Sequence, residues 1–181
     1  ILQRLVVMPG IDHLADFVEA GLNYGSGDGR CHVGHAKVVP SDDIDAAELR
    51  EQVRVAHDAG WPVAIHVVDI DQLDAALGAI ETSRAPPGTR DRLEHNALSL
   101  PEQVERIARS GAAVVTQPSF LLHRARRYAE ELSPVEYDWL YRVGSLVRAG
   151  VTVAGSSDAP VAPARPLEVA MAAMSRGGGG S

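Results

Sequence analysis

The sequence predicts an α/β fold in which parallel strands alternate with helices. Short runs rich in β-branched residues are each followed by a stretch whose apolar residues recur at helical spacing. The connections are short, which favours right-handed strand–helix–strand units and a parallel sheet. The runs are continuously apolar, as expected when both faces of a sheet are covered. About six such units fit either an open doubly wound sheet or most of an eight-stranded TIM barrel. A complete barrel needs about 250 residues, more than the 181 present.

Six strands are predicted, each a short apolar run bounded by glycine, proline or polar residues. The second ends at Pro40, because proline cannot donate a hydrogen bond to a neighbouring strand. The predicted strands cover residues 5–8, 35–39, 62–68, 92–95, 113–116 and 151–155.

Six helices are predicted between and after these strands. Ser41, Asp42 and Asp43 have the chemistry of helix N-caps, and Gly60 stands where a glycine commonly ends a helix. Residues 25–29 form a glycine-rich loop, and residues 121–134 form a long polar segment. The predicted helices cover residues 12–20, 41–59, 71–81, 99–110, 137–149 and 166–175.

Composition narrows the classes of protein. Asp and Glu number 24 against 17 Lys and Arg, a net charge of −7, which argues against the basic surface that nucleic-acid binding needs. No apolar run approaches the roughly 18 residues typical of a membrane span. The single Cys31 excludes an internal disulfide and a zinc site made of cysteines alone. We therefore expect a cytoplasmic protein with a small-molecule substrate and with neither a nucleic-acid nor a membrane partner.

The two ends of the chain are typical of a piece of a longer protein. The chain begins at Ile1 rather than at methionine, directly before a predicted strand. It ends in Gly177-Gly178-Gly179-Gly180-Ser181, the composition of a flexible linker. We expect residues 1–176 to form one incomplete barrel domain and residues 177–181 to be a Gly/Ser-rich tail.

Four polar residues interrupt or end the predicted strands: Lys37, His66, His95 and Asp158. Each has a structural alternative, since a strand histidine can be a core residue, Asp158 can cap a turn and Lys37 can reach solvent. The carboxyl ends of parallel barrel strands share one face, so the four side chains are expected to converge. Two imidazoles and a carboxylate are good ligands for a divalent transition metal such as zinc. Their joint occurrence on strand ends favours a metal site.

Lys37 stands out because it lies within an apolar strand. Burial disfavours the charged form of lysine and so favours a neutral amine. A neutral amine near a metal takes up carbon dioxide to form a carbamate, an anion that bridges two metal ions as a carboxylate does. Lys37 is thus a candidate bridging ligand.

The other histidines are weaker candidates. We expect His57 on the surface of a helix, His13 and His32 in loops or at helix edges, and His35 in a packing role. His123 follows the fifth predicted strand and is a candidate substrate contact.

Four motifs in this order resemble the amidohydrolase superfamily, and amidohydrolase family 3 most of all. The resemblance extends over nearly the whole chain, from the strand at Leu5 to the helix ending near Ser175. The motifs are Val63-Ala64-Ile65-His66, Arg92-Leu93-Glu94-His95, Val115-Thr116-Gln117-Pro118 and Ala154-Gly155-Ser156-Ser157-Asp158-Ala159-Pro160.

The resemblance implies a distorted TIM barrel with one or two divalent metal ions, zinc above all, on its carboxyl face. It places Lys37 at the bridging position of strand four, and His66 and His95 as metal ligands on strands five and six. Asp158, on strand eight, would bind metal and take a proton from the attacking water.

The substrate mouth is expected along residues 117–128. Gln117, His123 and Arg124 are the candidate substrate contacts. Arg126 and Arg127, like Arg124, are available for an acidic group, although arginines in a polar segment are commonly a solvated face.

The sequence departs from the family at one point, because it contains no His-x-His pair. In the family this pair lies on the first barrel strand, so the first two strands and a small β-domain are expected before Ile1. The missing N-terminal barrel segment, or a second copy of the chain, is then an expected partner.

We expect a metal-dependent amidohydrolase that splits a non-peptide C–N bond, an amide or cyclic amide, with the isolated chain inactive if its ligand set is incomplete. The alternatives are a non-catalytic scaffold or interaction module derived from such a barrel, and a doubly wound binding domain.

Overall fold

The computed structural model describes residues 3–41 and 43–175. The expected tail, 177–181, lies outside the described residues, and so does Asp42. The strands of the described part are β1 (Leu5–Val7), β2 (Cys31–Val33), β3 (Ala36–Val38), β4 (Val63–Val67), β5 (Arg92–His95), β6 (Ala113–Thr116) and β7 (Val153–Gly155). Its helices are η1 (Ile11–His13), α1 (Leu14–Glu19), α2 (Ala46–Asp58), α3 (Ile70–Thr82), α4 (Pro101–Ser110), α5 (Phe120–His123), α6 (Ala125–Glu131), α7 (Pro134–Trp139), α8 (Val143–Arg148) and α9 (Pro166–Ser175). Among these helices, none combines the length and apolar character needed to cross a bilayer.

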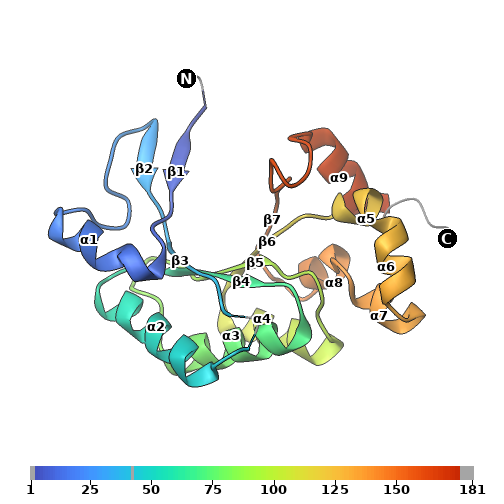
Figure 1. Ribbon diagram of the computed structural model, residues 1–181, viewed down its shortest axis with the longest axis horizontal. Coiled ribbons are helices and arrows are strands. Elements are labelled where there is room, and N and C mark those ends of the chain that lie inside the picture. The colour runs from blue at the N-terminus through green and yellow to red at the C-terminus, as the bar shows by residue number, and fades with distance from the viewer. Residues whose placement is uncertain (1–2, 42, 176–181) are drawn as a thin grey trace.

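The main sheet is parallel and its strands follow one another in sequence order, β3-β4-β5-β6-β7. Helices α2, α3 and α4 cover one face of it (Figure 1). A doubly wound sheet reverses its strand order at a switch point, and this sheet does not. The α/β prediction is confirmed, the doubly wound alternative is wrong, and the molecule is a partial barrel.

Strand β1 continues the barrel beyond β3 through a bend. β1 pairs in parallel with β2, from Leu5 opposite Cys31 to Val7 opposite Val33. Further along, Gly10 lies opposite Lys37. From Val7 to Gly10 the chain advances by three positions, whereas from Val33 to Lys37 it advances by four. The extra residue makes a bulge. A Cβ atom on Gly34 would lie 2.5 Å from Cγ1 of Val6, so only glycine allows the two backbones to approach here. We did not predict β2, whereas the strand at residues 5–8 is confirmed.

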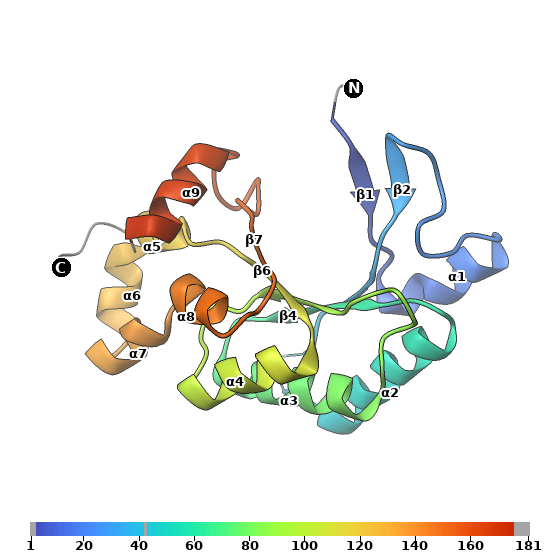
Figure 2. The same ribbon diagram turned by 180° about the vertical axis from the view of Figure 1, so that it is seen from behind.

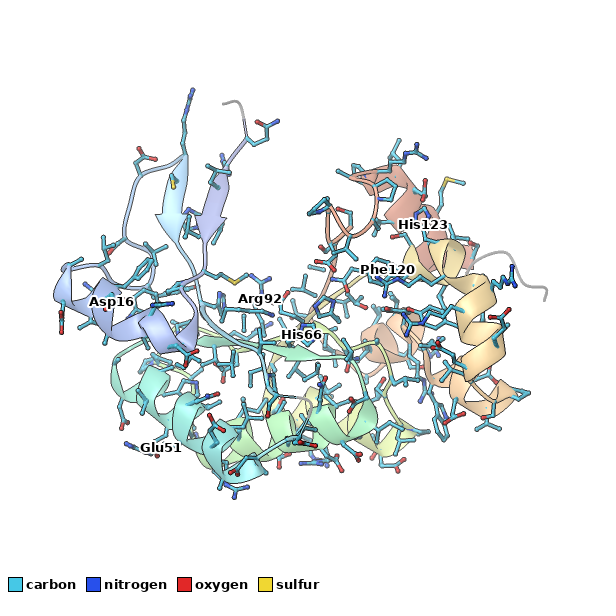
Figure 3. The ribbon with its side chains drawn as sticks, viewed as in Figure 1. Asp16, Glu51, His66, Arg92, Phe120 and His123 are labelled. Carbon is cyan, nitrogen blue, oxygen red and sulfur yellow. The ribbon has the colours of Figure 1, made fainter. Side chains whose placement is uncertain are left out.

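The two faces of the sheet differ in chemistry. The helix-covered face is apolar, with Val38, Ile65 and Leu93 fully buried against the helices. The opposite face has His66 and Arg92, which lie between the arm formed by β1 and β2 and the arm formed by α5 and α9 (Figures 2 and 3). The expectation of apolar strands with both faces covered is therefore wrong for the described residues. Lys37, His66 and Arg92 each stand next to apolar residues in the sequence. This is the alternation of polar and apolar side chains of a sheet covered on one face, and not an apolar run with interruptions.

Helix α2 begins later than predicted, at Ala46. Its N-cap is Asp45, whose carboxylate accepts hydrogen bonds from the backbone N–H groups of Ala47 (2.8 Å) and Glu48 (3.1 Å). Ser41 instead donates its hydroxyl to the carbonyl of Asp43. Gly60 follows the helix with a φ of +82°, the left-handed conformation that a terminating glycine adopts, as expected.

The segment after β6 is more helical than predicted. The polar stretch 121–134 folds largely into α5 and α6, and the helix predicted over 137–149 is broken into α7 and α8. The break lies at Leu140, which is extended, and Tyr141, which has a φ of +41°. Both residues are buried, so packing of this corner overrides the helical spacing of the sequence.

His57, predicted on the surface, is instead buried at the amino end of the sheet. Its Nε2 donates to Oδ1 of Asp91 (3.0 Å), and its Nδ1 shares a hydrogen bond with the Ser83 hydroxyl (2.8 Å). The same Asp91 oxygen accepts the backbone N–H of Val63 (3.0 Å). Asp91 therefore links α2, the start of β4 and the chain entering β5.

We predict that Asp91→Ala lowers the free energy of unfolding by about 2–3 kcal/mol, because two buried donors lose their acceptor. Urea unfolding followed by circular dichroism measures this change. Glu105→Ala is the control, since it removes an exposed ion pair with Arg109, and its effect should stay below about 1 kcal/mol. Equal effects of the two variants would contradict a stabilising role for Asp91.

Candidate active site

His66 and His95 come together at the carboxyl ends of two neighbouring strands. In the register of β4 and β5, Val67 lies opposite His95 and His66 opposite Glu94. His95 has a φ of +69°, and Asn96 after it a φ of +46°, so the chain turns sharply where β5 ends. The two imidazole rings lie edge to face with centroids 4.4 Å apart. The predicted convergence of these two residues is therefore present.

Gln117 orients the His95 ring through a hydrogen bond. Nδ1 of His95 donates a hydrogen bond to Oε1 of Gln117 (2.8 Å), and Gln117 is 2% exposed. With the proton on Nδ1, Nε2 of His95 keeps a free lone pair. Gln117 was predicted as a substrate contact, but its amide oxygen contacts the imidazole.

Burial also keeps His66 neutral. Burial, together with the neighbouring His95 and Lys37, lowers the pKa of His66 to about 4, against an opposing effect of Asp158 and Asp69. The neutral His66 ring thus lies edge to face with the His95 ring. Neutral imidazole is the form of histidine that binds metal ions.

Asp158 shares a cavity with the two imidazoles. This cavity of about 450 Å³ is lined by His66, His95 and Asp158 at one end and by residues of α5 and α6 at the other. Asp158 lies in the loop after β7 with a φ of +57°, and its backbone N–H donates to the Ser156 hydroxyl (3.2 Å). The left-handed conformation is one that Asp and Asn adopt more readily than most residues.

Lys37 lies on the same open face of the sheet but does not line this cavity. Burial lowers the pKa of the Lys37 amine, while the charge of Glu94 and, to a smaller degree, that of Asp158 raise it. Glu94 accepts a hydrogen bond from Nε of Arg92 (2.8 Å). Lys37 is therefore next to an ion pair that our sequence analysis did not include in the site.

His123 and Arg124, both predicted as substrate contacts, differ in their position relative to the cavity. His123 pairs with Glu168 of α9 and lies in the upper arm, apart from His66 in Figure 3. Its ring joins α5 to α9 and does not line the cavity, so the structure gives it a packing role. Arg124 does line the cavity, as predicted for residues 117–128. His35, expected in a packing role, donates Nε2 to the Arg90 carbonyl (3.0 Å).

Our sequence analysis missed the aromatic wall of the cavity. Phe120, Tyr128 and Tyr141 all line it, in a chain with only 2 Phe and 4 Tyr. Their scarcity is a usable signal, because four of the six Phe and Tyr residues, these three and Tyr137, lie within residues 120–141. The break before Tyr141, which brings its ring back to Tyr128, had no local signal.

As a metal centre the site is incomplete in the described part of the chain. Across residues 3–41 and 43–175, no three His, Cys, Asp or Glu side chains lie close enough together to hold a metal ion. His66 and His95 supply two suitable nitrogen donors, and Asp158 faces the same cavity. The donor types fit a divalent transition metal, and further ligands are needed to complete the shell.

The fold and the cavity define the class: a parallel-barrel protein in which His66 and His95 meet at the carboxyl ends of the strands. A model of the amidohydrolase family matches residues 10–180. The chain therefore belongs to the amidohydrolase family, as the sequence motifs implied.

Two curated relatives extend this result. YtcJ of Bacillus subtilis (strain 168), whose name places it among amidohydrolases, is 31% identical over 123 residues, 68% of this chain and 23% of its own. Protein LONG AFTER FAR-RED 3 of Arabidopsis thaliana is 30% identical over 139 residues, 74% of this chain and 24% of its own. The chain thus spans about a quarter of the length of these relatives.

Solved structures agree on the fold. An uncharacterized metal-dependent hydrolase from Pyrococcus horikoshii OT3 matches with a TM-score of 0.81 at 24% identity, over 96% of this chain and 39% of its own. Another from Pyrococcus furiosus has a TM-score of 0.83 at 20% identity, over 95% of this chain and 40% of its own. The chain is about two-fifths of the length of these barrel proteins.

We predict that His66 in chelator-treated protein titrates near pH 4, measured on its ring carbon signals by NMR. The folded-state pKa lies below the unfolded value of about 6.5. Between these values the unfolded chain binds a proton that the folded chain does not, so stability falls as the pH drops from 6.5 to 4. His35, whose pKa burial also lowers, adds a slope of the same sign, which is why the His66 signal itself is followed. A titration midpoint near pH 6.5 would show that the His66 ring is exposed to water.

Proposed function

We propose that this chain forms the metal-binding and proton-transferring part of an amidohydrolase that splits a non-peptide C–N bond with water. The observation on which this rests is the pair of imidazoles packed edge to face in a cavity that they share with Asp158. Family membership and the metal-dependent hydrolases among the structural neighbours support it. The bond type, an amide or cyclic amide, is part of the proposal.

His66 and His95 would hold a divalent cation, for which zinc is our candidate. Such an ion, when bound, supplies Lewis-acid polarisation of the substrate carbonyl and lowers the pKa of a water. The contribution of the chain is to keep His66 neutral and His95 oriented. Gln117 does this for His95 by accepting its Nδ1 proton, which leaves Nε2 for the ion.

Asp158 would act as general base and then as general acid. Its carboxylate accepts a proton from the attacking water and then delivers that proton to the leaving nitrogen. The cavity gives this carboxylate access to substrate while keeping it close to the imidazoles.

Lys37 is proposed as a further ligand in carbamate form. Burial favours its neutral amine, which adds carbon dioxide and releases a proton. The neighbouring Glu94 opposes this change, because its negative charge favours the ammonium form. The assignment therefore depends on a cation at the imidazoles that outweighs Glu94.

The second candidate function is a non-catalytic scaffold or interaction module. The observation that favours it is the missing group of three metal-binding side chains within the described residues. Metal binding separates the two functions. If the amidohydrolase proposal holds, we still expect low activity from the 181-residue chain alone, because its ligand set is incomplete.

We predict that the chelator-treated chain binds Zn²⁺ at a site that depends on His66, measured by calorimetric titration. Gln117→Leu should weaken this binding about 10–100-fold, because the His95 ring loses the acceptor that fixes it. Gln52→Leu, which removes only a hydrogen bond with Glu48 on the surface of α2, is the control. Zinc binding that is absent, or that survives His66→Ala unchanged, would favour the scaffold.

We predict that Asp158→Asn in the intact, zinc-loaded protein lowers amide turnover about 10²–10⁴-fold, the usual contribution of a general base. Asparagine accepts the left-handed conformation at this position, so the fold should be unchanged. Release of primary amine from a panel of amides and cyclic amides measures turnover, and zinc content is read in parallel. Retained turnover with metal still bound would refute the role of Asp158.

A further inference from the structure

The cavity has a second end, away from the imidazoles, that the proposed hydrolysis does not use. Its walls come from α5, α6 and the corner before α8, and they are mainly aromatic and aliphatic. Phe120, Leu140 and Tyr141 of this wall are almost fully buried, which makes it a fixed surface. The side chains that line this end include Leu98, Phe120, Arg124, Arg127, Tyr128, Glu131, Leu132, Leu140 and Tyr141.

Arg124 is the one cation of this segment without a carboxylate. Among its neighbours, Arg126 donates Nε to Glu130 (2.8 Å) and Arg127 donates Nε to Glu131 (2.9 Å). The Arg126–Glu130 pair is exposed, whereas Arg127 and Glu131 also line the cavity, where they pair with one another. Within residues 3–41 and 43–175, no ion pair is formed by Arg124.

The Arg124 side chain is held by the Phe120 ring. Its guanidinium carbon lies 4.2 Å from the centre of that ring. Stacking of this kind uses the face of the guanidinium and leaves its N–H groups at the edge for a planar anion. The position is therefore one at which a carboxylate can be bound through two hydrogen bonds.

The rest of this end offers apolar surface, hydroxyl groups and one carboxylate, that of Glu131. The hydroxyls of Tyr128 and Tyr141 lie 3.1 Å apart and share a hydrogen bond. Burial and this bond raise the pKa of Tyr141, so its hydroxyl stays protonated at neutral pH. Glu131, which also reaches the cavity, is neutralised by Arg127. The charge of Arg124 is thus left for a ligand to balance.

The cavity lining thus includes the cation of Arg124, from the segment between α5 and α6, and the carboxylate of Asp158, from the loop after β7. An anionic group is attracted to Arg124 and repelled by Asp158, which orients a bound molecule. We propose that the cavity takes amides with an aromatic or aliphatic group and a carboxylate, the carboxylate on Arg124 and the amide towards Asp158. The assignment of the amide as the bond that breaks rests on the proposed function, whereas the recognition of the anion does not.

The test compares two probes that differ in charge alone, N-acetyl-DL-phenylalanine and N-acetyl-DL-phenylalaninamide. Binding to the full 181-residue chain is measured by calorimetry in the presence of chelator, so that no turnover occurs. We expect the acid to bind at least tenfold more tightly than its carboxamide. Arg124→Met should remove this preference and change the affinity for the carboxamide by less than twofold.

Arg126→Met is the matched control, because it removes an arginine two positions away that already has a carboxylate partner. It should leave the preference for the acid unchanged. Arg124→Gln removes the same charge with a polar side chain and gives a second measurement should the methionine variant unfold. Equal affinity for the two probes, no saturable binding of the acid, or an equal loss in the Arg126 variant would overturn the inference.

A second measurement, of amine release, separates this inference from the proposed hydrolysis. Zinc is added to the intact protein, and amine release from both probes is followed. A preference for the acid without amine release would support the anion-binding end and refute the hydrolysis of these amides. Equal rates of amine release from the two probes, with equal affinities, would refute the anion-binding end and support the hydrolysis.

Discussion

The parallel pairing of β3 to β7 in sequence order is the constraint on which the rest of the molecule depends. It brings the carboxyl ends of the strands to one edge, where the side chains after each strand meet. The register of β4 against β5 then decides which residues face one another, and it places His66 beside the end of β5. Burial of Val38, Ile65 and Leu93 under the helices holds this register, because a slip by one residue would expose the apolar set.

The alternation of side chains along each strand explains why ionisable groups gather on the open face of the sheet. Each strand that buries an apolar residue under the helices presents its neighbour on the other side, and those neighbours include Lys37, His66 and Glu94. Partial burial makes charge costly for the lysine and the histidine, so both are shifted toward neutrality. Glu94, which pairs with Arg92, opposes this shift for Lys37, because its negative charge raises the pKa of the lysine.

The sequence predicted most of the strands and the centre of the site because both have local signals. β5, β6 and α9 were placed at their observed bounds, and His66, His95 and Asp158 stood out as polar residues at the ends of apolar runs. What failed depends on contacts distant in sequence. His57 reads as a surface residue until Asp91, 34 positions later, is folded against it.

The remaining errors have the same origin. Four residues with N-cap chemistry precede α2 in the sequence, Ser41, Asp42, Asp43 and Asp45, and local composition does not indicate that Asp45 is the cap. The placement of Gln117 behind His95 and of His123 against Glu168 requires the packed sheet and the arm formed by α5 and α9.

The bulge at Gly34 has a consequence for how the length of this chain can change during evolution. Because strand residues alternate between faces, the extra residue reverses the parity of everything after it: Val33 and Val38 both end in the apolar layer although they are an odd number of positions apart. Deleting one residue here would turn Lys37 towards the helices and Val38 towards the open face. We therefore expect an insertion or deletion of two residues between Val33 and Ala36 to keep this parity, whereas a change of one residue reverses it.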